Sequence, residues 1–216
     1  MKQRHPSPLT LAGVAGVLWA SAALLTAFVV GAAGTPAMDA TVSGGLDVFA
    51  HANGWIVPLA RFFALMGSGL VLFPITVAVV LVLLRQHPWW AAWVAACGLG
   101  GLLISQTVKR AVDRQRPQWP DPFETLDSAS FPSGHSMAGI YGWVVFGVVA
   151  LCLLSPPWNR AAGIGLITFG VMMGPSRALL GVHWPTDVLA GWLFAGAWVM
   201  TAGAVIVWWR SRVGPD

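Results

Sequence analysis

The stretch that separates the last two apolar runs of the chain reads Ser176-Arg177-Ala178-Leu179-Leu180-Gly181-Val182-His183-Trp184-Pro185-Thr186-Asp187. It places an arginine, a histidine and an aspartate in a chain of 216 residues that is 56% hydrophobic and only 9% charged. Polar side chains at a membrane edge are costly unless they pair, so Arg177, His183 and Asp187 form a candidate functional site. Because His183 and Asp187 are four residues apart and Pro185 favours a helix start, the carboxylate can orient the imidazole ring.

The composition predicts a membrane protein, because a soluble domain carries about 25% charged residues. We expect an all-α fold, a polytopic membrane helix bundle with six transmembrane helices that forms a single domain over residues 1–216. The expected spans cover about residues 9–33, 60–84, 89–108, 134–154, 161–177 and 187–209. The segment 34–54 is rich in Gly, Thr, Ser and Asp and is expected to be a loop.

The first apolar run has two interpretations. Lys2 and Arg4 precede it and resemble the basic start of a signal peptide. The run is longer than the roughly 7 to 15 apolar residues of a signal peptide, which favours a retained span.

Glycine is abundant in the fifth span, where Gly170 and Gly174 form a Gly-x-x-x-Gly pair. Such a pair permits close helix contact. With 25 glycines in the chain, chance spacing explains it equally well.

Six spans place both termini on one side of the membrane, and the basic residues indicate which side. The terminal side carries six basic residues and one acid, namely Lys2, Arg4, Arg85, Arg160, Arg210, Arg212 and Asp216. The opposite side has as many basic residues but seven acids, and most of its basic residues belong to the candidate site. The positive-inside rule therefore predicts cytoplasmic termini in the cytoplasmic (inner) membrane and a site on the outer face.

Two connections, residues 109–135 and 176–187, open on that outer face and hold the unusual polar residues. The first contains Lys109, then Arg116-Pro117 seven residues on, and ends in Pro132-Ser133-Gly134-His135. Guanidinium and ammonium groups suit a dianionic tetrahedral group, and backbone N–H groups at a helix start also face anions. This combination around two histidines predicts phosphoryl transfer.

Other charged residues of the first connection have simpler interpretations. Arg110 and Arg114 are equally well explained as interfacial charges at the end of a span. Asp121, Glu124 and Asp127 are expected to form a solvated loop face, with selection of lipid headgroups as the alternative.

The three motifs, Lys-x6-Arg-Pro, Pro-Ser-Gly-His and Ser-Arg-x5-His-x3-Asp, together resemble the signature of the type-2 phosphatidic acid phosphatase superfamily. The match runs from about residue 109 to residue 187, and three separated motifs with internal spacing are a specific signal. The departures are small: Gln115 stands where relatives often have proline, and Ser136 where a small residue is usual.

The resemblance implies a role for each matched residue. His183 would be the nucleophile, Asp187 would orient it, and His135 would protonate the leaving oxygen and then activate water. The remaining matched positions would bind the substrate phosphate, namely Lys109, Arg116, Ser133, Gly134 and Arg177. The resemblance requires no metal and no cofactor.

The resulting hypothesis is a membrane lipid phosphatase that acts through a phosphohistidine, with an undecaprenyl-type prenyl diphosphate as the first substrate choice. Phosphatidylglycerophosphate or phosphatidic acid is the alternative within the same class. A lipid phosphotransferase and a non-enzymic lipid-binding bundle are the alternatives from other classes. A lipid phosphate is the expected partner, and nucleic acid is not, because no basic face remains outside the spans.

Overall fold

The computed structural model describes residues 6–213, and this part of the chain is helical and contains no strand. The expected all-α class is therefore confirmed. The helices are α1 (Pro8–Gly31), α2 (Ala37–Ala52), α3 (Ile56–Met66), α4 (Gly69–Leu84), α5 (Pro88–Val112), α6 (Gly134–Ala138), the π-helical η1 (Gly139–Val144), α7 (Val145–Leu153), α8 (Trp158–Leu179) and α9 (Pro185–Val213).

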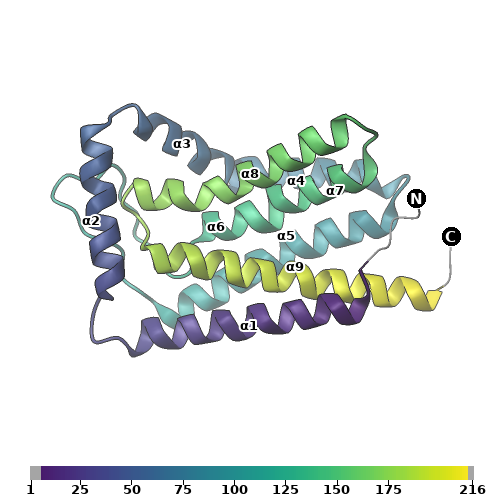
Figure 1. Ribbon diagram of the computed structural model, residues 1–216, viewed down its shortest axis with the longest axis horizontal. Helices are drawn as coiled ribbons and strands as arrows, with labels where there is room; N and C mark the ends of the chain where they lie inside the picture. Colours follow the sequence, from purple (N-terminus) through teal and green to yellow (C-terminus); the bar gives the residue numbers. More distant parts are fainter. Residues whose placement is uncertain (1–5, 214–216) are drawn as a thin grey trace.

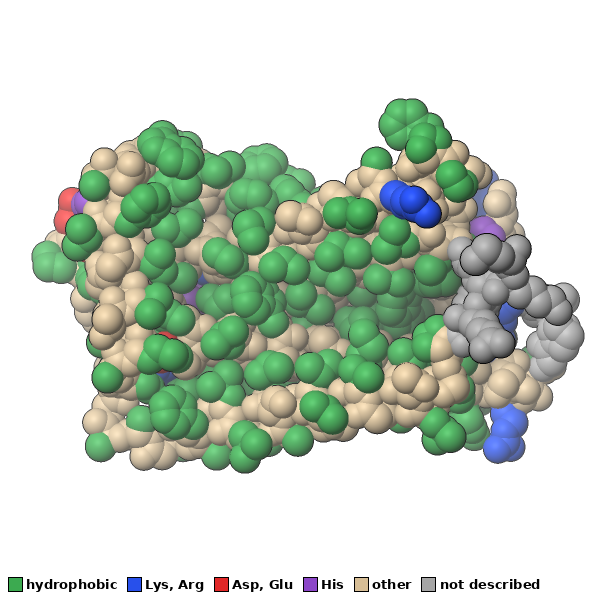
Figure 2. All heavy atoms as spheres, in the orientation of Figure 1, with side chains coloured by type: hydrophobic (Ala, Val, Ile, Leu, Met, Phe, Trp, Pro, Cys, Tyr) green, Lys and Arg blue, Asp and Glu red, His purple; other side chains and the backbone are tan. Residues whose placement is uncertain are grey.

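Five elements within residues 6–213 are long and apolar enough to cross a membrane: α1, α5, α6 to α7 taken together, α8 and α9. The number rises to six if α2 and α3, which meet at a bend of 117°, count as one broken span. Large apolar side chains are exposed along the bundle, and in the face seen in Figure 2 the charged groups gather toward its two ends. Such a surface is stable only against lipid, so the chain is a multi-pass membrane protein.

The expectation of a loop over residues 34–54 is wrong, because most of this segment forms α2. The helix buries Asp39, Ser43 and Ala50 on one face. With 16 residues it is too short to cross a membrane by itself, but one buried face is enough to stabilise a helix that packs on a bundle. Figure 1 shows α2 lying across one end of the long helices.

The expected continuous span over residues 60–84 is also divided, because α3 ends at Met66 and α4 begins at Gly69. With 16 residues, α4 is about 24 Å long, shorter than the roughly 30 Å hydrocarbon core. A Cβ atom on Gly67 would lie 3.1 Å from Cδ2 of His135, so the break brings a glycine against a candidate catalytic residue. The indole of Trp143 donates to the carbonyl oxygen of Met66 at 3.0 Å and satisfies this helix end.

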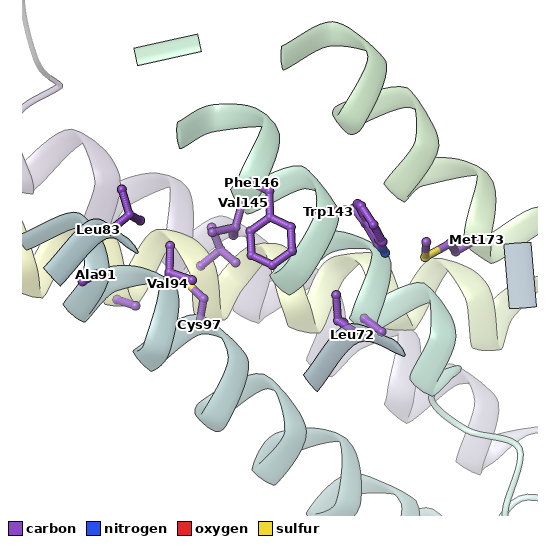
Figure 3. Close-up of a cluster of buried hydrophobic side chains, with 12 residues drawn as sticks. Leu72, Leu83, Ala91, Val94, Cys97, Trp143, Val145, Phe146 and Met173 are labelled. Carbon is purple, nitrogen blue, oxygen red and sulfur yellow. The ribbon is translucent and has the colours of Figure 1, made fainter. Parts of the chain in front are cut away.

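The main core lies between α4, α5, η1, α7 and α8, where the side chains of Leu72, Val94, Phe146 and Met173 pack together (Figure 3). Within it, the backbones of η1 and α8 approach closely at a glycine pair. A Cβ atom on Gly170 would lie 2.5 Å from the carbonyl oxygen of Gly139. Gly174 faces α9 instead, where its Cβ atom would lie 2.6 Å from Cγ1 of Val188, so the two glycines of the Gly-x-x-x-Gly pair permit close contacts with different helices.

The arrangement of the helices separates the chain ends from the polar connections. The start of α1 and the end of α9 lie at the same end of the bundle, and α1 packs along α9 (Figure 1). The loop after α5, the loop after α8 and helix α2 lie at the opposite end. All the motif residues are therefore at the end that α2 crosses.

Candidate active site

The eight predicted site residues are carried by four helix ends and two loops, all at this end of the bundle. Lys109 is in the last turn of α5 and Arg177 in the last turn of α8, while Asp187 is in the first turn of α9. Ser133 caps α6, which begins with Gly134 and His135. The loops carry Arg116 and His183.

Direct contacts join the three sequence motifs. The backbone N–H of Ser133 donates to the carbonyl oxygen of Asp187 at 3.0 Å, which ties the second motif to the third. Arg116 Nη1 lies 3.1 Å from Nε2 of His183, which ties the first motif to the third. A Cβ atom on Gly191 would lie 2.8 Å from the carbonyl oxygen of Ser133, so a glycine is needed for α6 to sit this close to α9.

The tautomer of His183 follows from its two neighbours. A guanidinium group can only donate, so Nε2 of His183 accepts from Arg116 and carries a lone pair. The proton is then on Nδ1, which lies 3.4 Å from Oδ2 of Asp187. Among residues 6–213, Nδ1 makes no hydrogen bond of good geometry, so its link to Asp187 in this structure is a longer polar contact.

Burial keeps this ring neutral. The side chain of His183 is 2% exposed. Desolvation lowers the pKa of His183 to about 4, although the polar contact with Asp187 and its negative charge act in the opposite direction. At neutral pH the unprotonated Nε2 is therefore the dominant form and is chemically able to act as a nucleophile.

Asp187 is itself held at both carboxylate oxygens. Its Oδ2 accepts from the backbone N–H of Trp184 at 2.9 Å, and its Oδ1 accepts from Arg114 Nη1 at 2.6 Å. The side chain is fully buried. A buried carboxylate fixed in this way has little freedom to turn away from His183.

Arg116 also organises the surrounding loop. It donates from Nε to the carbonyl oxygen of Ser128 at 2.7 Å and from Nη1 to that of Val182 at 2.6 Å. Burial, followed by the nearby positive charge of Arg177, lowers the pKa of Arg116 from its usual value. A concentration of positive charge of this kind favours an anionic ligand.

Lys109 and His135 complete the cluster. Lys109 Nζ donates to the carbonyl oxygen of Ala129 at 2.6 Å, and its Cε would lie 3.8 Å from a Cβ atom on Gly134. His135 lies within electrostatic range of Lys109, Arg116, Arg177 and His183.

Three contributing residues were not identified from the sequence. Glu124, expected on a solvated loop face, pairs with Arg177. Arg114, for which an interfacial role was equally plausible, contacts both Asp187 and Asp39. Asp39, assigned to a loop, is fully buried. Only the position of Arg114 two residues before Arg116 gave a local signal.

The structure is that of an all-helical membrane protein in which cationic side chains gather around two histidines. Residues 89–212 match the PAP2 superfamily. Because this match covers more than half of the chain, the protein belongs to the PAP2 superfamily, and the resemblance noted in the motifs is confirmed.

Similar proteins of known name agree with this assignment. The chain is 32% identical over 152 residues to an undecaprenyl-diphosphatase of Sulfolobus acidocaldarius, covering 68% of this chain and 66% of the relative. It is 32% identical over 178 residues to a decaprenylphosphoryl-5-phosphoribose phosphatase of Mycobacterium tuberculosis, covering 79% and 80%.

The fold is shared with a crystal structure of a transmembrane PAP2-type phosphatidylglycerolphosphate phosphatase from Bacillus subtilis. The TM-score is 0.74 at 24% identity, with 88% of this chain and 94% of the other chain covered.

Proposed function

We propose that this protein is a membrane lipid phosphatase that hydrolyses the terminal phosphate of a prenyl diphosphate through a phosphohistidine at His183. The reaction has two steps at one site. Three cationic side chains, Lys109, Arg116 and Arg177, hold the phosphate in both.

In the first step, Nε2 of His183 attacks phosphorus and the bond to the lipid oxygen breaks. His135 enters this step protonated and gives its proton to that oxygen, so the prenyl monophosphate leaves with one negative charge fewer than it would otherwise carry. Asp187 stabilises the positive charge that develops on the His183 ring, because its carboxylate faces Nδ1.

In the second step, the now unprotonated His135 takes a proton from water, and the water oxygen attacks the phosphohistidine. The N–P bond breaks, inorganic phosphate leaves, and His183 returns to its neutral form. In both steps the cationic groups stabilise the equatorial oxygens, as charge clamps do in other phosphoryl transfers.

The observation that carries this proposal is the contact between Arg116 Nη1 and Nε2 of His183 at 3.1 Å. It directs the lone pair of a buried, neutral imidazole toward the guanidinium that would bind the phosphate. When Arg116 Nη1 donates to a phosphate oxygen in place of Nε2, the lone pair is freed and phosphorus is brought next to it, which is the near-attack arrangement that a displacement at phosphorus needs.

The choice of a prenyl substrate is supported by the names of the two relatives, one an undecaprenyl-diphosphatase and the other a decaprenylphosphoryl-5-phosphoribose phosphatase. The alternative is phosphatidylglycerophosphate, the substrate named for the Bacillus subtilis phosphatase whose fold this chain shares.

We further propose that the termini are cytoplasmic and the candidate active site faces outward across the inner membrane. The arrangement of the start of α1 and the end of α9 at one end of the bundle is consistent with this orientation (Figure 1). Three of the charged residues on which the predicted orientation rests, Lys2, Arg4 and Asp216, lie outside the described residues.

The test is phosphate release by the detergent-purified protein from a prenyl diphosphate, phosphatidic acid and phosphatidylglycerophosphate, with EDTA present throughout. We expect release from the prenyl diphosphate to be fastest, unaffected by EDTA and abolished in His183→Ala. Release from no substrate, or equal release by His183→Ala, would overturn the proposal.

A further inference from the structure

Asp39 is a buried carboxylate far in sequence from the three motifs and outside the region that matches the superfamily. It lies in the first turn of α2, the helix that crosses the end of the bundle. Its Oδ1 accepts from the backbone N–H of Thr186 at 3.0 Å, and its Oδ2 from the Thr186 hydroxyl at 2.6 Å. Arg114 Nη2 donates to the same Oδ2 at 2.7 Å.

The other side of the Arg114 guanidinium faces the candidate active site. Nη1 donates to Oδ1 of Asp187 at 2.6 Å and to the hydroxyl of Thr186 at 2.8 Å. One guanidinium thus bridges two fully buried carboxylates, each through a separate nitrogen. Its plane is fixed because both nitrogens are engaged.

This bridge determines which oxygen of Asp187 faces the histidine. Oδ1 is occupied by Arg114, so Oδ2 is the oxygen that lies 3.4 Å from Nδ1 of His183. Without Asp39, Arg114 would be held on one side only, and Thr186 would lose two bonds at the turn that precedes Asp187.

The charges point the same way. Two carboxylates share one guanidinium, so the bridge of Asp39, Arg114 and Asp187 has a net negative charge on the Nδ1 side of His183 when its ring becomes positive during attack. Neutralising Asp39 would leave Arg114 to Asp187 alone and would weaken the stabilisation that Asp187 gives to the ring.

We propose that Asp39 is a positioning residue: through Arg114 and Thr186 it fixes the carboxylate of Asp187 against His183. The proposal rests on the proposed function, since it assigns Asp39 a role in the phosphorylation step. Asp39 does not contact the residues assigned to phosphate binding, so its loss should lower kcat and leave KM unchanged.

The first test compares Asp39→Asn with Asp47→Asn, a change of the same kind on the same helix. Asp47 pairs with His51, away from the bridge. We expect kcat of Asp39→Asn to fall roughly 10- to 100-fold at unchanged KM, which is the loss that follows removal of groups that orient metal ligands in metalloenzymes. Asp47→Asn should match the wild type. Equal kcat in both variants, or a change in KM alone, would overturn the proposal.

A double-mutant cycle with Arg114→Lys separates positioning from simple docking of α2. Lysine keeps the charge but cannot bridge two carboxylates through separate nitrogens, so Arg114→Lys should itself lose kcat at unchanged KM. In the Arg114→Lys background, Asp39→Asn should lower kcat only about threefold further, because both changes break the same bridge. A full additional loss would mean that Asp39 acts independently of Arg114 and would contradict the proposal.

Failure of the role proposed for Asp39 can be distinguished from failure of the proposed function. If Asp39→Asn does not fold, the activity of Arg114→Lys tests the bridge between Asp39 and Asp187. Full activity in that variant would show that catalysis does not need the bridge. If the wild type hydrolyses its substrate and both Asp39→Asn and Arg114→Lys have the same kcat as the wild type, only the role proposed for Asp39 fails. If the wild type hydrolyses nothing, the proposed function fails instead.

Discussion

Arg177 and Glu124 form a two-pronged ion pair, with Nη1 to Oε2 at 3.0 Å and Nη2 to Oε1 at 3.2 Å. Arg177 is 1% exposed, whereas the side chain of Glu124 is 33% exposed and comes from the loop between α5 and α6. A carboxylate therefore occupies both terminal nitrogens of a guanidinium that the proposed mechanism gives to the substrate phosphate, while Nε has no hydrogen-bond partner among residues 6–213. Phosphate must compete with Glu124 for this arginine.

Removing this competitor should strengthen anion binding. We expect Glu124→Gln to lower the inhibition constant of inorganic phosphate about fivefold, since a partly exposed pair is worth about 1 kcal/mol. Asp127→Asn is the matched control, because it removes the same charge from an exposed position of the same loop. Unchanged or weaker inhibition in Glu124→Gln, or an equal gain in Asp127→Asn, would show that Glu124 does not compete.

The protonation of His183 can be measured directly by nitrogen NMR of the imidazole. Because burial lowers the pKa of His183 to about 4, the ring should remain neutral, with its proton on Nδ1, from neutral pH down to about pH 5. Asp187→Asn should lower this pKa further, since the carboxylate is the group that raises it. A doubly protonated ring at pH 7, or a proton on Nε2, would contradict the assigned nucleophile.

Arg116 should not tolerate lysine, although the charge is kept. Lysine cannot reproduce the fork that contacts Ser128, Val182 and His183, so buried carbonyl groups would lose their donors at about 1 to 3 kcal/mol each. We expect lower thermal stability and a kcat/KM reduced by about 100-fold. Arg110→Lys, at an exposed position of α5, should change neither quantity.

The contact between η1 and α8 should be sensitive to a single methyl group. Gly170→Ala places a Cβ atom 2.5 Å from the carbonyl oxygen of Gly139, so we expect destabilisation of about 1 to 3 kcal/mol from overpacking. Gly165→Ala lies on the same helix with nothing within 4 Å and should be neutral or stabilising. Thermal unfolding in detergent measures both, and equal stability of the two variants would contradict the close approach.

The sequence was informative where a signal is local. Apolar runs predicted most of the long helices, and motif spacing predicted that Lys109, Arg116, His135, Arg177, His183 and Asp187 would gather at one end. Helix α2 was missed because the Gly, Thr, Ser and Asp residues of its segment are typical of a loop and obscure its single buried face. The division between α3 and α4 was missed because only two small residues, Gly67 and Ser68, interrupt an otherwise continuous apolar run.

Contacts between distant residues could not be predicted. Asp39 and Thr186 are separated by 147 positions, and no spacing rule connects a carboxylate in one connection with a helix start in another. Glu124 resembled its exposed neighbours Asp121 and Asp127, and only the folded loop distinguishes it. Such partners depend on how the elements pack, which a single sequence does not specify.

The most direct measurement is the trapping of a phosphoenzyme from a ³²P-labelled aryl phosphate, whose phenolate can leave without a proton from His135. We expect His135→Ala to accumulate an acid-labile, alkali-stable label, because attack by His183 proceeds while activation of water is lost. The same label should be absent from His183→Ala and from the variant that lacks both histidines. A label that persists without His183, or turnover by His183→Ala at the wild-type rate, would contradict a phosphohistidine at this position.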